Sequence, residues 1–192
     1  MEVKRDANHR YTIDGVCVPS VTQVIKAAGY MGNTAHYTDE SRDRGTYVHA
    51  VTAAWDTGNL VMEQVYALGL EYTLPYLEAW KKFRAETGFE PTEIELIVGH
   101  PTLMYAGTLD RSHRGCLTKT ICDIKTGSPA PWHAIQTAAY AGCLSGIWQR
   151  CGVYLAGTGA YKLEWHEGFD DWDAFVAALS AWKWKAKHGL ND

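Results

Sequence analysis

The sequence predicts a mixed fold, α/β or α+β, in which helices flank a central mixed β-sheet. Residues 92–98 alternate polar and apolar side chains, and further strand-like runs follow at 103–110, 119–125 and about 160–165. Segments with helical periodicity stand before and between these runs. Because 192 residues are enough for one domain with a sizeable core, we expect a single domain over residues 1–192.

The N-terminal part begins with a short hairpin and a capped helix. Residues 11–18 form a candidate β-hairpin, because Asp14 and Gly15 favour a tight two-residue turn. Ser20 and Gln23 then stand three residues apart, which is the spacing of a capping box that opens a helix.

Four longer helices are expected. Two cover about 38–55 and about 72–86, which makes the region of about 20–88 mainly helical. After the third strand, Pro131 suits the first turn of a long helix that reaches about residue 151. A C-terminal helix over about 170–188 closes the chain, and its expected N-cap is one of two acidic residues, Asp170 or Asp171.

Composition narrows the classes of function. Hydrophobic residues make up 46% and charged residues 21% of the sequence, as in ordinary soluble globular proteins. The sequence shows no apolar signal segment and no membrane-spanning stretch, so we expect a cytoplasmic protein without a membrane partner. The formal net charge of −4 excludes a histone-like positive field. A local basic patch, such as Arg111, Arg114 and Lys119, still allows one nucleic-acid groove.

Three charged residues accompany the second and third strands, namely Asp110, Asp123 and Lys125. One interpretation places them on the solvent-exposed face of a sheet. The other is a metal site, because Asp123 and Lys125 share one face of their strand and Asp110 ends the strand before it. Two neighbouring carboxylates repel each other unless a divalent cation such as Mg²⁺ or Mn²⁺ lies between them. An ammonium group beside that cation can assist a water or offset charge on a phosphoryl oxygen.

Two of the expected helices each carry a pair of residues four positions apart that could belong to the same site. Gly45 and His49 share a helical face, so the glycine permits close approach of another backbone and the histidine can reach a metal. On the later helix, Gln136 and Tyr140 share a face with His133. Taken singly, a hydrogen-bonded structural histidine and an ordinary polar helix face are the commoner explanations.

Taken in order, these motifs resemble the RecB-type branch of the PD-(D/E)XK nucleases, which includes phage exonucleases and the mitochondrial genome maintenance exonuclease. The resemblance spans about residues 19–165, and Pro19-Ser-Val-Thr-Gln-Val24 is similar to the N-terminal helix opening of phage and mitochondrial members. The matching motifs are Gly45-x-x-x-His49, Glu95, Gly107-Thr-Leu-Asp110, Asp123-Ile-Lys125-Thr-Gly and Gln136-x-x-x-Tyr140.

The resemblance implies a restriction-endonuclease-like αβββαβ core over about 38–165 and a division of roles. The metal ligands would be His49, Asp110, Asp123 and the backbone carbonyl of Ile124. Lys125 would assist the attacking water, with Asp123, Asp110 and Glu95 as the acidic catalytic residues. Glu93 is the alternative to Glu95 if the strand register differs. The nucleic-acid contacts would be Gln136, Tyr140, Arg44, Ser20 and Thr22.

The cysteines separate this chain from some members of that branch. CRISPR-adaptation and AddB-type members hold an iron–sulfur cluster with one early cysteine and three late ones. Here no C-x-x-C pair occurs and no third late cysteine follows Cys143 and Cys151, so we expect no iron–sulfur cluster and reduced thiols. The full set is Cys17, Cys116, Cys122, Cys143 and Cys151.

The resemblance therefore implies a stand-alone Mg²⁺- or Mn²⁺-dependent DNA exonuclease of phage type, for recombination, replication or repair in a bacterial cytoplasm. Its partners would be single- or double-stranded DNA ends and a single-strand annealing or binding protein. Unpaired bases would stack on aromatic residues. The candidates are Tyr47, Tyr105, Trp132 and Tyr140. Three alternatives stay open: an endonuclease of the same fold, a DNA-end-binding protein with little cleavage, and an unrelated α/β protein with solvated charges.

Overall fold

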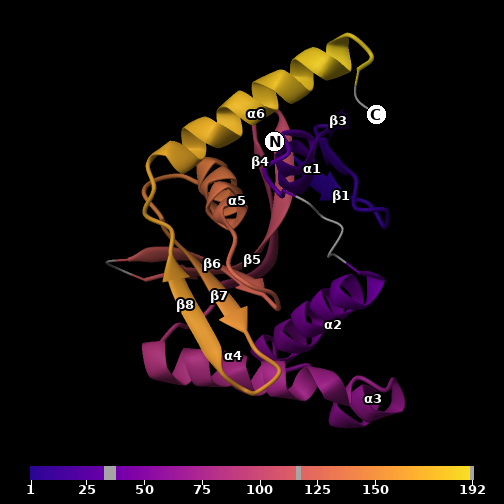
Figure 1. The fold of residues 1–192 in the computed structure, drawn as a ribbon, viewed down its shortest axis with the longest axis vertical. Coiled ribbons are helices and arrows are strands. Elements are labelled where there is room, and N and C mark those ends of the chain that lie inside the picture. Colours follow the sequence, from indigo (N-terminus) through magenta and orange to yellow (C-terminus); the bar gives the residue numbers. More distant parts are fainter. Residues whose placement is uncertain (33–37, 116–117, 191–192) are drawn as a thin grey trace.

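The computed structural model describes residues 1–32, 38–115 and 118–190 and contains two β-sheets (Figure 1). Cys116 lies outside the described residues, and the described cysteines are all free. The larger sheet has five strands in the order β4-β5-β6-β7-β8. They are β4 (Glu93–His100), β5 (Tyr105–Arg114), β6 (Lys119–Lys125), β7 (Gln149–Leu155) and β8 (Tyr161–Trp165).

The large sheet is mixed, as predicted. Strands β6 and β7 are parallel, and every other neighbouring pair is antiparallel. Helix α5 (Pro131–Gly142) makes the crossover that a parallel pair requires. The sequence-based expectation of one helix up to residue 151 is wrong, because α5 ends at Gly142 and β7 begins at Gln149. The apolar run of β7 is almost entirely buried beside β6, so tertiary pairing decided its conformation.

The small sheet and the first helix follow the predicted local signals. Strands β1 (Val3–Arg5), β2 (Tyr11–Ile13) and β3 (Val16–Val18) are antiparallel. The turn between β2 and β3 has two positive φ angles, 47° at Asp14 and 82° at Gly15, which matches a tight hairpin. Helix α1 (Val21–Ala27) opens on the predicted capping box, in which Ser20 and Gln23 each accept from the other's backbone N–H.

The remaining helices surround the large sheet. They are α2 (Asp39–Asp56), α3 (Met62–Ala67), the 3₁₀ turn η2 (Glu71–Thr73), α4 (Leu74–Thr87) and α6 (Asp170–Lys187). The expected N-cap of α6 is wrong, because Phe169 occupies that position and makes no side-chain cap. Asp170 and Asp171 lie within the first turn, where negative charge complements the helix dipole.

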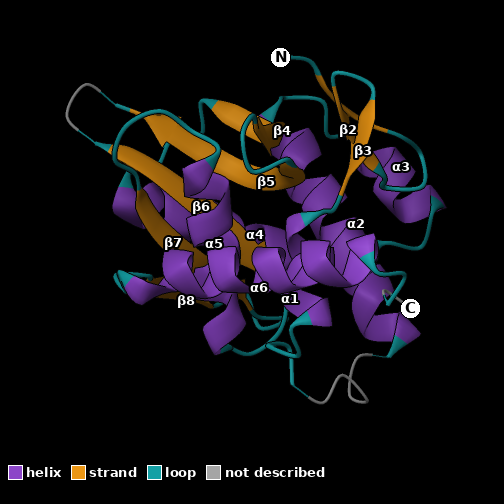
Figure 2. Ribbon diagram, turned by 90° about the horizontal axis from the view of Figure 1, so that it is seen from above, coloured by secondary structure: helices purple, strands orange, loops and turns teal. Residues whose placement is uncertain are grey.

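Helices cover both faces of the large sheet, and each face has its own apolar cluster. Helices α1, α5 and α6 pack on one face, and α2 and α4 pack on the other (Figures 1 and 2). In β6, Ile121 belongs to the first cluster, whereas Cys122 and Ile124 belong to the second. Asp123 and Lys125 therefore lie on the α5 side of the sheet, at the end of a central strand.

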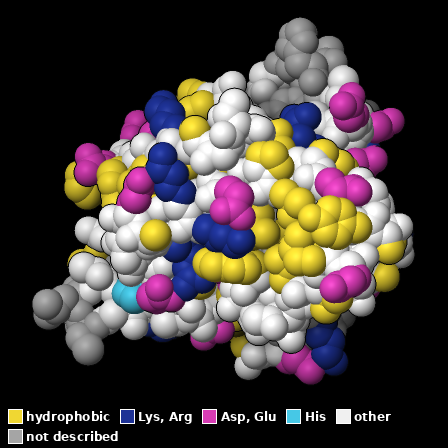
Figure 3. All heavy atoms as spheres, turned by 90° about the horizontal axis from the view of Figure 1, so that it is seen from below, with side chains coloured by type: hydrophobic (Ala, Val, Ile, Leu, Met, Phe, Trp, Pro, Cys, Tyr) yellow, Lys and Arg dark blue, Asp and Glu magenta, His cyan; other side chains and the backbone are white. Residues whose placement is uncertain are grey.

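The outer surface over α3 and α4 carries a patch of hydrophobic side chains with charged groups around it (Figure 3). Within the described ranges, no helix is both long enough and apolar enough to cross a membrane. The predicted basic patch is partly wrong, since Arg111 is fully buried. Arg114 and Lys119 instead lie over the ring of Trp148, at 4.8 and 5.8 Å from its centre.

Candidate functional site

Three potential metal ligands from three different elements meet at one end of the sheet. His49 comes from α2, Glu95 from β4 and Asp110 from β5, and one ligand atom of each lies within 4.8 Å of the others. His49 Nδ1 is 3.5 Å from Asp110 Oδ1 and 3.8 Å from Glu95 Oε1. Two carboxylates with one imidazole form a donor set suited to a divalent cation.

The electrostatics of this group reflect mutual contact. Burial by itself would lower the pKa of His49, but Asp110 and Glu95 outweigh burial and raise this pKa above its usual value. Burial by itself would raise the pKa of Glu95, but His49 and Arg111 lower it overall. The imidazole of His49 therefore interacts with both carboxylates, and Glu95 has Arg111 as a second, closer positive partner.

The backbone is irregular where Glu95 and Asp110 meet. Glu95 has a φ of 52°, a left-handed conformation that non-glycine residues rarely adopt inside a strand. Leu109 packs with the cluster on the α5 side, whereas Arg111, two residues later, reaches α2 on the opposite side. Regular alternation would place both on one face, so β5 changes face at Asp110. Asp110 thus lies inside β5, and the expectation that it ends the strand is wrong.

Asp110 is held directly against the next strand. Its Oδ2 accepts a 2.7 Å hydrogen bond from the backbone N–H of Ile124. The register that pairs Arg111 with Cys122 places Asp110 opposite Asp123 when it is continued by one residue. The two aspartates therefore lie next to each other on adjacent strands, as the sequence predicts.

Asp123 and Lys125 form the second part of the site. Lys125 Nζ lies 2.6 Å from Asp123 Oδ2 and donates to Gln136 Oε1 at 3.1 Å. Asp123 is 1% exposed; its Oδ2 pairs with Lys125, and its Oδ1 has no hydrogen-bond partner among the described residues. Burial raises the pKa of Asp123 to about 6, with Asp110 adding to the rise and Lys125 opposing it. Such a buried and incompletely satisfied carboxylate fits a cation-binding role.

Gln136 and Tyr140 continue this network behind Lys125. Gln136 Nε2 donates to Tyr140 Oη at 2.9 Å, and both side chains are buried. A Cβ at Gly107 would lie 2.7 Å from Tyr140 Cε1, so the glycine makes room for the tyrosine ring. Tyr105 is fully buried and donates to the Ala139 carbonyl, so its expected stacking on a base is wrong.

The site opens into a cavity of about 600 Å³. Its lining includes His49, Glu95, Asp110, Lys125, Gln136 and Tyr140. A neighbouring cavity of about 250 Å³ contains Ser20 and Thr22, and Thr22 also lines the main cavity. Arg44 lines a third cavity on the other flank, past Lys125. Glu93 is not part of the metal-ligand group, whereas Glu95 is.

Sequence patterns missed the buried support of this site. The Arg111 guanidinium donates to Asp56 Oδ2 at 2.5 Å, to Glu95 Oε1 at 3.1 Å and to Thr52 Oγ1 at 3.1 Å. Asp56 also pairs with Arg84, 2.9 Å away. Arg111 thereby connects α2, which carries His49, to the strand that carries Glu95. Its position in a polar stretch resembled a surface charge, and no sequence pattern distinguished the two.

Comparisons with known proteins find a structural similarity but no sequence match. No protein-family model matches the chain, and no curated protein sequence matches it. The structure is similar to that of an alkaline exonuclease (LHK-Exo) from Laribacter hongkongensis, with a TM-score of 0.49 and 19% sequence identity. The match covers 89% of this chain and 88% of that chain. At this level of similarity, the case for a function rests on the residues of the site itself.

Proposed function

We propose that this protein is a divalent-metal-dependent deoxyribonuclease that hydrolyses phosphodiester bonds at DNA ends. One observation carries the proposal: the Lys125 ammonium stands beside the buried carboxylate of Asp123, next to the group formed by His49, Glu95 and Asp110. The ammonium group and the carboxylates border an open cavity. Together they suit an attack on a phosphodiester, which is negatively charged.

The donor set fits Mg²⁺ or Mn²⁺. Asp110 and Asp123 would hold the ion with His49 and the Ile124 carbonyl, and Glu95 would reach the same ion, a second ion or a bound water. The Oδ1 atom of Asp123 supports this assignment: it is buried and has no hydrogen-bond partner among the described residues, whereas a buried carboxylate oxygen normally has a donor or a cation. When bound, the ion would lower the pKa of a water and offset negative charge on the phosphate.

The protein's own groups orient the reaction. Gln136, itself held by Tyr140, keeps Lys125 Nζ directed toward Asp123. The ammonium would orient the attacking water and stabilise charge on a phosphoryl oxygen. On the two flanks of the site, Ser20 and Thr22 on one side and Arg44 on the other would contact phosphates of the bound strand.

As an exonuclease, the protein would serve recombination, replication or repair of phage type, with a single-strand annealing or binding protein as its partner. The test uses linear DNA labelled separately at each end, single- and double-stranded, with Mg²⁺ or Mn²⁺. The expected result is metal-dependent release of mononucleotides or short oligomers, which Lys125→Ala abolishes. Lys162→Ala, an exposed lysine paired with Glu164, is the matched control and should retain activity.

Each alternative has its own outcome in this assay. Cleavage of a circular single-stranded substrate would replace the exonuclease assignment with an endonuclease. Tight end binding without cleavage under either metal would favour a DNA-end-binding protein. The absence of both cleavage and binding would reject the proposal.

A further inference from the structure

A cavity of about 520 Å³ lies beside the candidate site and shares Gly45, His49 and Lys125 with it. Its walls come from the N-terminal half of α2, the loop over residues 126–130 and the first turn of α5. This flanking cavity lies on the opposite flank from Ser20 and Thr22, which line the neighbouring 250 Å³ cavity. Its volume matches a ligand the size of a nucleotide rather than of water alone.

The flanking cavity differs from its neighbours in charge. Among the residues that the structure describes, its lining contains Arg44 and Lys125 and no aspartate or glutamate. The metal-site cavity, by contrast, contains Glu95 and Asp110. The first turn of α5 also faces the flanking cavity, and the positive end of a helix dipole favours an anion. Its electrostatics therefore suit a phosphate group.

Arg44 has donor capacity available. Its Nε is buried and has no hydrogen-bond partner among the described residues. A buried guanidinium nitrogen without an acceptor is costly, and a phosphate oxygen is the acceptor that guanidinium groups match best.

His133 offers a second hydrogen-bond donor, and its contacts determine which ring nitrogen carries the hydrogen. The backbone N–H of Ala130 donates to His133 Nδ1 at 3.2 Å, and Tyr154 Oη lies 2.9 Å from the same atom. Nδ1 is therefore an acceptor, and a neutral ring must carry its hydrogen on Nε2. Burial and the nearby Lys125 lower the pKa of His133 to about 3, which keeps the ring neutral. His133 lines this cavity, and Nε2–H is its one ring donor.

Trp132 supplies an aromatic surface in the same cavity. Its ring centre lies 5.6 Å from Lys125 Nζ, and the ring contacts His133 edge-on, with centres 4.1 Å apart. An indole beside two phosphate-binding donors is an arrangement that accepts a base and its phosphate together.

We propose that the flanking cavity is a nucleotide subsite, in which Arg44 and the Nε2–H of His133 bind a phosphate and Trp132 stacks on the attached base. The subsite rests on the proposed nuclease function and extends it, because it holds the nucleotide next to the bond that is cut. Its ligand class is a nucleoside monophosphate unit, either within a DNA strand or as the released product.

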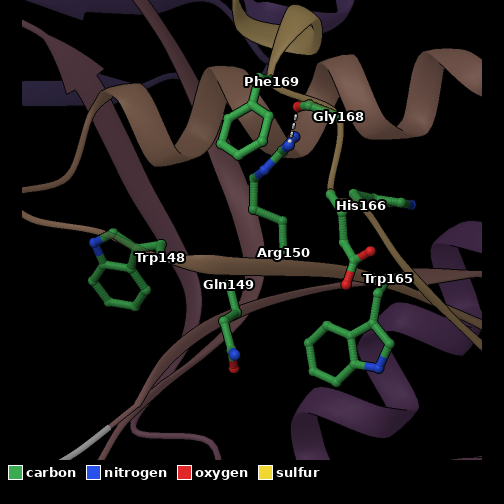
Figure 4. A pocket seen from close by; sticks show the side chains of 8 residues that line it. Trp148, Gln149, Arg150, Trp165, His166, Gly168 and Phe169 are labelled. Carbon is green, nitrogen blue, oxygen red and sulfur yellow. Dashed lines mark hydrogen bonds between the residues drawn. The ribbon is translucent and has the colours of Figure 1, made fainter.

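A further pocket, formed by Trp148, Arg150, Trp165 and Phe169, also combines aromatic and basic residues (Figure 4). It is not a candidate for a phosphate site, because its arginine is already paired. The Arg150 guanidinium already donates to the carbonyls of Ala134 and Gly168 and to Asp171. Arg150 pairs with Ile121 at the start of β6, whereas Lys125 ends that strand, so this pocket lies away from the site.

The test measures binding of thymidine 5′-monophosphate to the chain of residues 1–192 by NMR titration in EDTA, so neither metal nor cleavage contributes. Inorganic phosphate and thymidine serve as separate probes. Arg44→Met removes the charge and keeps the aliphatic stem, and it should weaken binding of the monophosphate about tenfold or more. His133→Asn keeps an acceptor near Nδ1 and removes Nε2, and it should weaken binding about tenfold.

Trp132→Ala should weaken binding of the monophosphate but not of inorganic phosphate, which separates the base contact from the phosphate contact. Arg42→Met is the matched control, because Arg42 lies on the same helix in an exposed pair with Asp39, and it should bind like wild type. Retained dispersion in the NMR spectrum shows that each variant is folded.

The subsite is overturned if wild type binds no monophosphate, or if Arg44→Met and His133→Asn both bind it like wild type. DNA cleavage in Mn²⁺ is measured separately. Cleavage by wild type together with unchanged binding in both variants would reject the subsite and leave the nuclease intact. Variant-sensitive binding without any DNA cleavage would support the subsite and reject the nuclease.

Discussion

The carboxylate of Asp110 accepts a 2.7 Å hydrogen bond from the backbone N–H of Ile124. A side chain of one strand thereby takes the place of a backbone acceptor for the next strand. Because Ile124 stands between Asp123 and Lys125, this bond fixes Asp110 relative to both. This hydrogen bond therefore helps to fix the relative positions of the three charged residues.

Asp110→Asn tests the charge of that carboxylate separately from its hydrogen bond. The asparagine oxygen can still accept from Ile124, so the free energy of unfolding should change by about 1 kcal/mol or less. The loss of negative charge should weaken Mn²⁺ binding more than about tenfold, measured by calorimetry. Glu93→Gln, on the same sheet but outside the metal-ligand group, should bind Mn²⁺ like wild type. Equal Mn²⁺ affinity in wild type and Asp110→Asn would contradict the assignment of the metal ligands.

Arg111→Met should be among the most destabilising single changes. Arg111 is fully buried, and its removal would leave the buried Asp56 with only part of its compensation. Breaking a buried ion pair in this way costs about 3–5 kcal/mol, measured by denaturant unfolding. Arg111→Lys should recover little, because a single ammonium cannot reach Asp56, Glu95 and Thr52 together. Arg42→Met, at an exposed pair, should cost about 1 kcal/mol or less, and an equal cost at both arginines would refute this account.

Two motif glycines should respond differently to alanine. At Gly107 the added Cβ would lie 2.7 Å from Tyr140 Cε1, so Gly107→Ala should destabilise the protein by about 1–3 kcal/mol. At Gly45 the nearest atom is Thr126 Oγ1 at 3.8 Å, an ordinary contact, so the close backbone approach expected there is absent. Because Gly45 lies inside α2, Gly45→Ala should stabilise the protein by up to about 1 kcal/mol. Thermal or denaturant unfolding compares the pair, and a reversed order would contradict the packing.

The free energy of unfolding should decrease at acidic pH because the folded protein keeps His133 neutral. Its pKa is about 3 in the folded protein, owing first to burial and then to Lys125, against an ordinary value of 6.5. Between these two pH values the unfolded chain binds more protons than the folded protein. The contribution of His133 to the free energy of unfolding is therefore constant above about pH 6.5 and decreases as the pH falls toward 3. Between pH 7 and pH 5 the wild type should lose about 2 kcal/mol more than His133→Asn. Parallel loss in both proteins would show that the imidazole is not held neutral.

Local sequence signals determined those elements that depend on neighbouring residues. The hairpin turn at Asp14 and Gly15, the capping box from Ser20 to Gln23 and the strand β6 all formed as predicted. Each of these depends on backbone propensity or on hydrogen bonds within a few residues, which a sequence displays directly. The strand pattern also predicted that Asp110, Asp123 and Lys125 would lie close together.

Only the tertiary structure decided the features that depend on distant partners. Strand β7 is defined by its parallel pairing with β6 across a helix, and its sequence alone read as a continuation of α5. Arg111 is buried because Asp56 and Glu95 meet it from another helix and another strand. Its burial depends on compensation by charges far away in the chain, and the free energy of such pairing is set by geometry that local sequence does not encode.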